Sequence, residues 1–413
     1  MDFNDTKEEA AFRQEVRDWI DANAPKHLEE DLASSGFGSV NNGSHDVLEE
    51  SKKWQKKKAE AGWACLAWPK EYGGRDASAI ESVIWNQEEG VYSKLSGHFI
   101  IGQGMCAPTL MSHATEEQKQ RFIPKIASGE DMWCQLFSEP SGGSDLAGLR
   151  TKAEKDGDDW IINGQKIWTS LAHLSQYGIL ITRTDPTVAK HKGLTMFFLD
   201  VNSPGVDIRP IKQANGQSGF NEVFFDNLRI PDSQRLGEVG DGWRVSLTTL
   251  MNERLAIGGM ISTGYPELKD LVMTLQINGK PAIKDPAVRS KLADWHCKAA
   301  GLKNTTSRTI SALSQGQTPG PESSIGKLVA GTMRQDVAKF ALDLQGLGGS
   351  IVDPSVALDS AQFQEMLLRA PAVRVEGGTD QILRNIIGER VLGLPVDMRA
   401  DKGLAFKDIP SGN

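Results

Sequence analysis

Cysteine is scarce in this sequence, which has 4 in 413 residues, and the four are widely separated: Cys65, Cys106, Cys134 and Cys297. Because no Cys-x-x-Cys pair is present, the sequence indicates neither a disulfide framework nor a cysteine-based zinc site. The 7 histidines form no His-Glu-x-x-His motif. We therefore expect no metal ion, and free thiols fit a reducing, cytoplasmic location.

Long apolar runs and net positive charge are also missing. No apolar stretch approaches the roughly 20 residues that a helix needs to cross a bilayer. Acidic residues near the amino terminus, such as Asp2, Asp5 and Glu8, are atypical of a targeting peptide. With 46 Lys and Arg against 54 Asp and Glu, the net charge is −8. We expect no membrane partner and no nucleic-acid partner, because nucleic-acid binding needs a basic face.

The first zone of the chain has a helical pattern. Residues 1–130 carry apolar residues at helical spacing, which predicts an all-α domain. Two capping boxes, Thr6-x-x-Glu9 and Thr115-x-x-Gln118, indicate where helices start. Between them, residues 32–46 are rich in Gly, Ser and Asn and are expected to form a surface loop.

The remainder of the chain is β-type and then helical again. Residues 131–241 contain short β-type runs separated by turns such as Asn163-Gly164, which predicts an antiparallel β-barrel or sandwich. Residues 242–398 return to helical spacing and predict a four-helix-type bundle, followed by a tail over 399–413. The expected fold class is α+β. The expected strands cover 133–138, 159–169, 177–182, 194–201, 206–211 and 222–230, and the later helices cover 245–257, 288–314, 324–347 and 379–392.

One short motif is similar to a dinucleotide-binding signature. Residues 102–107 read Gly-Gln-Gly-Met-Cys-Ala and follow a strand-like run at 98–101. The strand–helix–strand context that such a site requires is missing from the surrounding sequence. We therefore expect no NAD binding at this motif.

The most informative segment lies at 137–148, where an expected strand ends, and reads Phe-Ser-Glu-Pro-Ser-Gly-Gly-Ser-Asp-Leu-Ala-Gly. Small residues at 141–144, including Gly143, let backbone N–H groups approach an anionic or polar cofactor edge. Taken alone, the same string is equally typical of a glycine-rich hairpin loop. The rest of the sequence favours the cofactor interpretation.

Four motifs, in this order, give the sequence a family resemblance. They are Ser138-Glu139 with Gly143-Ser144-Asp145, Gly164-Gln165-Lys166-Ile167-Trp168-Thr169-Ser170, Gln345-Gly346-Leu347-Gly348-Gly349-Ser350 and Gly377-Gly378-Thr379-Asp380-Gln381. Together they span nearly the whole chain and resemble the acyl-CoA dehydrogenase flavoprotein family. The resemblance implies the same three-domain fold, bound FAD, an acyl-CoA substrate and an electron-transfer flavoprotein as partner.

The resemblance also implies which residues hold the cofactor. Phe137 and Ser138 would bond the pyrimidine edge of the flavin, Trp168 would pack on the ring, and Ser170 would lie near N5. An indole supplies a flat apolar wall, and hydroxyls stabilise charge on a reduced flavin. Further cofactor contacts are assigned to Gly143, Ser144, Gln345, Gly349, Thr379 and Gln381, and substrate contacts to Ser144 and Arg254.

Members of this family share FAD between subunits, which implies a homo-oligomer or hetero-oligomer, either a dimer or a tetramer. The turn at 345–349 and the stretch at 379–381 would reach the cofactor of another subunit, although a helix C-cap is an alternative role for Gly349. The family's Arg-x-x-Phe-Gly stretch, which supplies an Arg to the pyrophosphate, reads Leu275-Gln276-Ile277-Asn278-Gly279 here. The charge-assisted phosphate contact is therefore missing. A heteromer, in which a partner supplies that contact, is one interpretation.

Desaturation of a thioester needs a carboxylate that reaches the α-carbon and donors that hold the thioester oxygen. By resemblance, the Gly377 N–H is one donor. Many members carry the catalytic Glu directly before Gly-Thr, where this chain has Gly377, with Glu376 one residue early. A subgroup carries the base on the first long C-terminal helix, where this chain has Asn252-Glu253-Arg254. Glu253 is the first candidate for the catalytic base, and Glu376 is the second. The alternative is that Glu253 only forms an ion pair.

Three interpretations of the function remain open at this point. The first is an acyl-CoA dehydrogenase of lipid degradation. The second keeps the fold but lets reduced flavin react with oxygen, as in acyl-CoA oxidases and flavin monooxygenases. The third is a subunit that completes the cofactor site of a heteromeric dehydrogenase. The length and branching of the acyl chain depend on how the helices pack, so the sequence leaves them open.

Overall fold

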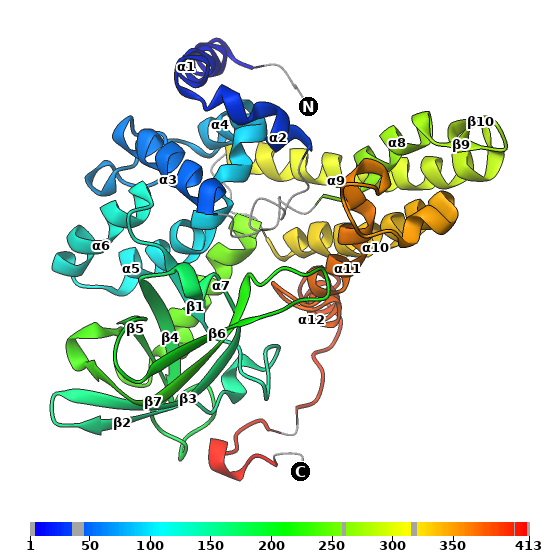
Figure 1. Ribbon diagram of the computed structural model, residues 1–413. Helices are drawn as coiled ribbons and strands as arrows, with labels where there is room; N and C mark the ends of the chain where they lie inside the picture. Colours follow the sequence, from blue (N-terminus) through cyan, green and yellow to red (C-terminus); the bar gives the residue numbers. More distant parts are fainter. Residues whose placement is uncertain (1–4, 35–44, 258–261, 315–319, 400, 411–413) are drawn as a thin grey trace.

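A β-sheet domain lies below two groups of helices (Figure 1). The computed structural model describes residues 5–34, 45–257, 262–314, 320–399 and 401–410. Helices dominate both ends of the sequence, and the strands lie between them. The expected α+β class is confirmed.

The amino-terminal part is helical, as expected. Both predicted capping boxes are present, because Glu9 N–H donates to Thr6 Oγ1 and Gln118 N–H donates to Thr115 Oγ1. A third box, formed by Ser78 and Glu81, was not predicted. The helices are α1 (Lys7–Asn23), α2 (Glu29–Ser34), α3 (His45–Glu60), α4 (Ala79–Glu89), α5 (Ala107–His113) and α6 (Glu116–Ser128).

Two local expectations in this part need correction. The run at 98–101 is helical, since a 3-10 helix covers Gly90–Phe99 and helical structure continues into a π-helix over Gly102–Cys106. A run of four mainly apolar residues is equally typical of a buried helix, so its spacing could not exclude one. The expected loop at 32–46 is helical at both ends, and its middle lies outside the described residues.

The middle domain is one eight-stranded sheet in the order β6-β7-β3-β2-β4-β5-β8, with β1 paired to β4. The expected antiparallel pairing holds for most strand pairs, but β1 runs parallel to β4, and β2 also pairs with β4 in parallel, at Lys152 and Arg183. A closed barrel is not confirmed, because the two ends of this order, β6 and β8, form no pair among the described residues. The strands are β1 (Trp133–Leu136), β2 (Lys152–Asp156), β3 (Asp159–Ser170), β4 (Tyr177–Arg183), β5 (Leu194–Asp200), β6 (Val206–Ile211), β7 (Phe220–Pro231) and β8 (Arg235–Leu236).

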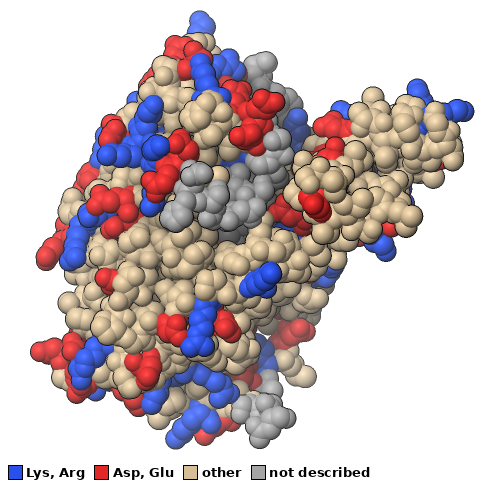
Figure 2. Space-filling model, in the orientation of Figure 1, with Lys and Arg blue, Asp and Glu red and all other residues tan. Residues whose placement is uncertain are grey.

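The carboxy-terminal part is again helical. Predicted helices correspond to α7 (Gly242–Ile257), α9 (Pro286–Ser314), α10 (Ser324–Gln345) and α12 (Asp380–Ile386), which continues as a π-helix to Val391. Two further helices, α8 (Tyr265–Thr274) and α11 (Gln362–Val373), were not predicted. On the face shown in Figure 2, the surface of these helices carries fewer charged side chains than the amino-terminal helices do.

Helix α7 connects the three parts of the molecule. It packs on α5, on the π-helix over Gly102–Cys106 and on β5. A Cβ atom added at Gly104 would lie 2.7 Å from Cβ of Ala256 on α7, so the glycine allows the two helices to touch. The Gly-x-Gly-x-x-Ala motif therefore serves close helix packing in this structure.

Candidate active site

The carboxylate of Glu253 lies where the helical and β parts meet. Glu253 is on the last turns of α7, and its Oε2 accepts a hydrogen bond of 3.2 Å from Nε2 of Gln135 on β1. A Cβ atom added at Gly377 would lie 3.7 Å from Oε1 of Glu253. The structure thus brings the first candidate base beside the Gly377 loop. The side chain of Arg254 lies outside the described residues.

Glu376, the second candidate base, is held by a different group. Its Oε2 accepts a hydrogen bond of 2.6 Å from Nη2 of Arg369 on α11. The backbone then passes through two left-handed residues, Gly377 at φ +59° and Gly378 at φ +92°. Glycine reaches these angles without the penalty that a Cβ imposes. The shift of one residue therefore turns Glu376 toward α11, while Gly377 faces Glu253.

Lys327, which holds the same loop, was not predicted from the sequence. This lysine is buried on the first turn of α10, and its Nζ donates a hydrogen bond to the carbonyl oxygen of Gly378. Burial lowers the pKa of Lys327, while the charges of Asp380, Glu376 and Glu253 oppose that shift. The ammonium group thus lies within electrostatic reach of both candidate bases.

A buried ion pair supports the segment at 137–139 from behind. Nζ of Lys166, on β3, lies 2.8 Å from Oε1 of Glu139 and donates to the Phe137 carbonyl at 3.0 Å. The Glu139 carboxylate also accepts from the N–H groups of Arg150 and Thr151, at 2.6 and 2.9 Å. Burial lowers the pKa of Lys166 to about 8. Burial acts to raise the pKa of Glu139, but Lys166 keeps it below its usual value.

The loop after this segment is open. Ser144 is exposed, and a Cβ atom added at Gly143 would lie 3.4 Å from Oγ of Ser138. Glycine thus leaves the backbone next to Ser138 uncovered, as expected for a polar cradle. Asp145 at the end of the loop forms an ion pair with Lys190 at 2.7 Å.

Trp168 is exposed at an irregularity in the pairing of β3 with β7. The register between β3 and β7 shifts between Lys166 and Thr169, and Trp168 has φ +60°. Such bulges re-aim a side chain. The indole is 55% exposed and meets Phe220 edge-on, with ring centroids 6.2 Å apart. Ser170 ends the strand, and the Oγ1 of Thr169 is buried with no hydrogen-bond partner among the described residues.

The remaining predicted cofactor residues lie on the C-terminal helices. Gln345 ends α10, and its buried Nε2 has no hydrogen-bond partner in the part of the chain that the structure describes. Thr379 caps α12, accepting from the Ile382 N–H at 3.2 Å, and Gln381 is exposed. A Cβ atom at Gly349 would lie 2.5 Å from the Leu342 carbonyl oxygen, so close packing requires this glycine. No hydrogen bond or ring contact within the described chain joins these residues to Phe137, Ser138 or Trp168.

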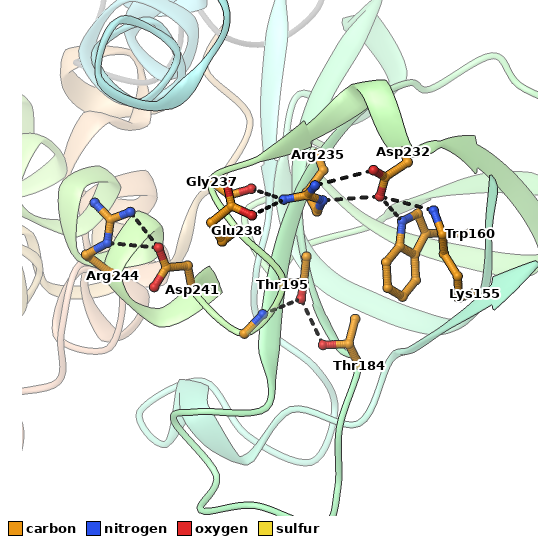
Figure 3. Close-up of polar contacts among 11 residues, drawn as sticks. Lys155, Trp160, Thr184, Thr195, Asp232, Arg235, Gly237, Glu238, Asp241 and Arg244 are labelled. Atoms are coloured by element: carbon orange, nitrogen blue, oxygen red, sulfur yellow. Dashed lines mark hydrogen bonds and ion pairs between the residues drawn. The ribbon is translucent and has the colours of Figure 1, made fainter. Parts of the chain in front are cut away.

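Separate sets of polar contacts lie before and at the start of α7 (Figure 3). Asp232 accepts hydrogen bonds from Trp160 and Arg235, and these bonds hold its pKa well below the usual range. The Gly240 N–H donates to Thr195 on β5 at 3.1 Å. Asp241 pairs with Arg244, on the first turn of the helix, at 2.6 Å. These contacts attach the amino-terminal end of α7, the helix that carries Glu253, to the β domain.

The described residues support neither a metal site nor a membrane-spanning helix. No group of three or more His, Cys, Asp or Glu side chains is arranged to hold a metal ion there. Among the helices of the same residues, none is both long and apolar enough to cross a membrane.

Comparison with known proteins gives matches along the whole chain. The acyl-CoA dehydrogenase N-terminal, middle and C-terminal domain models match residues 6–130, 134–228 and 240–392. The acyl-CoA dehydrogenase IpdE1 of Mycobacterium tuberculosis is 37% identical over 392 residues, which are 93% of this chain and 97% of IpdE1.

Two solved structures share the fold over nearly the same length. The Tcur3481-Tcur3483 steroid ACAD is similar with a TM-score of 0.79 and 28% identity, covering 96% of this chain and 100% of that one. The ChsE4-ChsE5 complex from Mycobacterium tuberculosis gives a TM-score of 0.78 and 27% identity, with the same coverage of 96% and 100%.

Proposed function

Since this chain belongs to the acyl-CoA dehydrogenase family of oxidoreductases, we propose that it is an FAD-dependent enzyme that desaturates an acyl-CoA thioester between Cα and Cβ. One observation carries the proposal. The Glu253 carboxylate lies beside Gly377, since a Cβ atom added at Gly377 would be 3.7 Å from Oε1 of Glu253. This proximity supports Glu253 as the proposed base and the Gly377 N–H as the proposed backbone donor. Such a pair is what removal of an α-proton next to a thioester requires.

The residues present fit a flavin. Trp168 offers an exposed aromatic face, and Gly143 leaves uncovered backbone beside Ser138. The buried Oγ1 of Thr169, which has no hydrogen-bond partner within the described residues, offers a hydrogen-bonding position to a polar ligand edge. We assign Phe137, Ser138, Gly143, Ser144, Trp168 and Ser170 to the cofactor of this chain, and Gln345, Gly349, Thr379 and Gln381 to the cofactor of a neighbouring subunit. Bound FAD supplies the acceptor for the hydride that leaves Cβ.

The protein's own residues supply the proton chemistry. In this proposal Glu253 takes the α-proton, and the Gly377 N–H donates to the thioester oxygen, where negative charge develops. Lys327 holds the Gly378 carbonyl, so the adjoining peptide keeps its orientation. Glu376 is the weaker candidate because Arg369 already binds its carboxylate.

The test of this function is an anaerobic titration. The purified, FAD-loaded protein is mixed with straight-chain, branched and ring-bearing acyl-CoA esters, and the flavin absorbance is followed. We expect at least one ester to bleach the flavin and to yield the corresponding enoyl-CoA. A flavin that no ester in the panel bleaches would overturn the proposed activity. Because one relative is named a steroid ACAD, we expect ring-bearing esters to react best.

Electron-transfer flavoprotein is the proposed acceptor, and oxygen is its alternative. Stopped-flow mixing of the reduced enzyme with air separates the two. Slow reoxidation in air together with fast reoxidation by electron-transfer flavoprotein is expected, whereas fast reaction with oxygen would favour the oxidase or monooxygenase interpretation.

A heteromeric assembly is a second candidate, and Leu275 favours it. This residue stands where the family has a pyrophosphate-binding Arg, and its half-buried side chain packs against the C-terminal apolar core. A tight hairpin of β9 (Gln276–Ile277) and β10 (Lys280–Pro281) follows it. The flavin content decides between the assemblies. One FAD per chain in a homo-oligomer would exclude the heteromer, and half occupancy with a second chain would support it.

A further inference from the structure

The carboxy-terminal tail crosses from the helices to the β domain (Figure 1). Residues 401–408 lie against the hairpin at 184–193, which connects β4 and β5. Ala405 forms a β-bridge with Ala189, and the Phe406 N–H donates to the Val188 carbonyl at 2.8 Å. The Lys407 N–H donates to the Pro186 carbonyl at 3.0 Å. The tail is therefore attached by backbone bonds as well as by side chains.

An ionic bridge joins the tail to the loop at 141–145. Nζ of Lys190, on the hairpin, lies 2.5 Å from Oδ2 of Asp401 and 2.7 Å from Oδ1 of Asp145. The side chains of Lys190 and Asp401 are only 12% and 17% exposed, so water screens this contact weakly. The side chain of Asp145 is 62% exposed, so its contact with Lys190 is screened more. The lysine thus binds one carboxylate from the tail and one from the residue directly after Ser144.

A buried arginine makes a second connection. Arg183, at the end of β4, donates to the carbonyls of Ala147 and Leu149, the former at 2.5 Å. Its guanidinium carbon lies 3.7 Å from the centroid of the Phe406 ring. Burial lowers the pKa of Arg183 to about 10, so the group keeps its charge at neutral pH. The aromatic face of the tail covers the cation that holds the backbone at 147–149.

We propose that residues 401–408 position the substrate-side loop at 141–149, so that the tail is required for tight binding of the CoA ester. The inference rests on the proposed function, because Ser144, assigned above to FAD, is assigned to the CoA ester as well only by family resemblance. Detaching the tail leaves Lys190 with one carboxylate and exposes Arg183 to water. Both changes loosen the same loop, since these two cations bind it at positions 145, 147 and 149.

The same hairpin also touches the start of α7. The rings of His191 and Trp243 meet edge-on, with centroids 4.7 Å apart. Trp243 lies on the first turn of α7, more than two turns before Glu253. The effect of the tail is thus expected mainly on the loop and on binding, and only weakly on the base.

The test uses the full-length, FAD-loaded protein with the substitutions Asp401→Asn and Phe406→Ala. Asp397→Asn, an equivalent change on the exposed segment before the tail, is the matched control. Hydrogen exchange followed by mass spectrometry reports on 141–149, and a second assay gives the dissociation constant of a CoA ester. We expect each tail variant to speed hydrogen exchange at 141–149 and to weaken binding of the CoA ester about three- to tenfold. A change of this size in affinity is expected when one such contact is lost. The control is expected to change neither.

Hydrogen exchange and CoA-ester binding together distinguish a failure of this inference from a failure of the proposed function. Faster exchange at 141–149 in the tail variants supports the positioning role even if the protein binds no CoA ester, which would overturn only the proposed function. Unchanged exchange at 141–149, with faster exchange confined to 401–408, would overturn the inference. Unchanged CoA affinity in both tail variants would overturn it as well.

Discussion

His98 makes stability depend on pH at the residue scale. Burial lowers its pKa to about 4, and its Nδ1 lies 3.1 Å from Ser51 Oγ. The unfolded chain therefore binds a proton between pH 6.5 and 4 that the folded chain does not bind. Stability is expected to fall as the pH drops through this window, by up to about 1.4 kcal/mol per pH unit.

Urea unfolding at pH 7 and pH 5 checks this dependence. His98→Gln removes the titrating group, so the stability of this variant is expected to change less between the two pH values. His27→Gln, which alters a mostly exposed histidine, should behave like the unmodified protein. Equal pH dependence in His98→Gln and the unmodified protein would contradict the account.

Lys327 is expected to act through the Gly378 carbonyl. A hydrogen bond from a charged group contributes about 1.5–3 kcal/mol. Lys327→Met should therefore lower kcat/KM by roughly 10- to 150-fold. Lys327→Arg keeps the charge and should retain more activity. Lys339→Met, on the exposed face of the same helix, is the control. Equal losses in the Met and Arg variants would show that only packing matters at this position.

The sequence could predict some site residues and not others. Glu253 and Gly377 were predicted from motifs, and the structure brings them together, although their roles remain predictions. Gln135 and Lys327 were not predicted, because each reaches the site from a separate element and neither belongs to a motif. The contact between Gln135 and Glu253 spans 118 positions, which local spacing cannot reveal.

At the scale of elements, the contact between the π-helix and α7 should be sensitive to one methyl group. Gly104→Ala places a Cβ atom 2.7 Å from Cβ of Ala256, and such overpacking costs about 1–3 kcal/mol. We expect a lower melting temperature, and slower turnover because Glu253 lies one turn before Ala256. The double variant Gly104→Ala with Ala256→Gly relieves the overlap. The double variant should lose less stability than the two single variants lose together. A loss equal to the sum of the two single losses would contradict this packing.

The elements differ in how clearly the sequence predicts them. β5 reads as a nearly continuous apolar run and was expected at almost its observed bounds. β2 reads Lys-Ala-Glu-Lys-Asp and buries only Ala153, so its pattern does not differ from that of a polar loop. Helix α11 contains Pro371, which weakens the helical signal although the helix continues to Val373. Whether such a segment forms a strand or a helix therefore depends on how neighbouring elements bury it.

At the scale of the whole molecule, the C-terminal part exposes many apolar side chains. Each of the following is more than half exposed: Leu347, Val352, Val356, Val375, Leu392, Leu394, Val396 and Met398. Apolar surface of this kind is typical of an interface. We expect light scattering to show a dimer or tetramer.

Two charge substitutions test where the interface lies. Leu347→Glu should weaken assembly, since Leu347 is 94% exposed in the single chain. Val239→Glu, at an exposed position of the β domain, should leave assembly unchanged. A monomeric unmodified protein, or equal effects of both substitutions, would contradict this assignment.

The central claim is that the carboxylate of α7 removes the α-proton. Glu253→Gln is nearly isosteric and should keep FAD and ligand binding, yet lose about 10²- to 10⁴-fold in the rate of flavin reduction. Anaerobic stopped-flow absorbance with a reactive acyl-CoA measures this rate directly, with Glu376→Gln as the matched variant. We predict that Glu253→Gln shows a ligand-induced spectral shift without bleaching, while Glu376→Gln is still bleached. Full bleaching in Glu253→Gln together with none in Glu376→Gln would contradict the account and place the base on the loop.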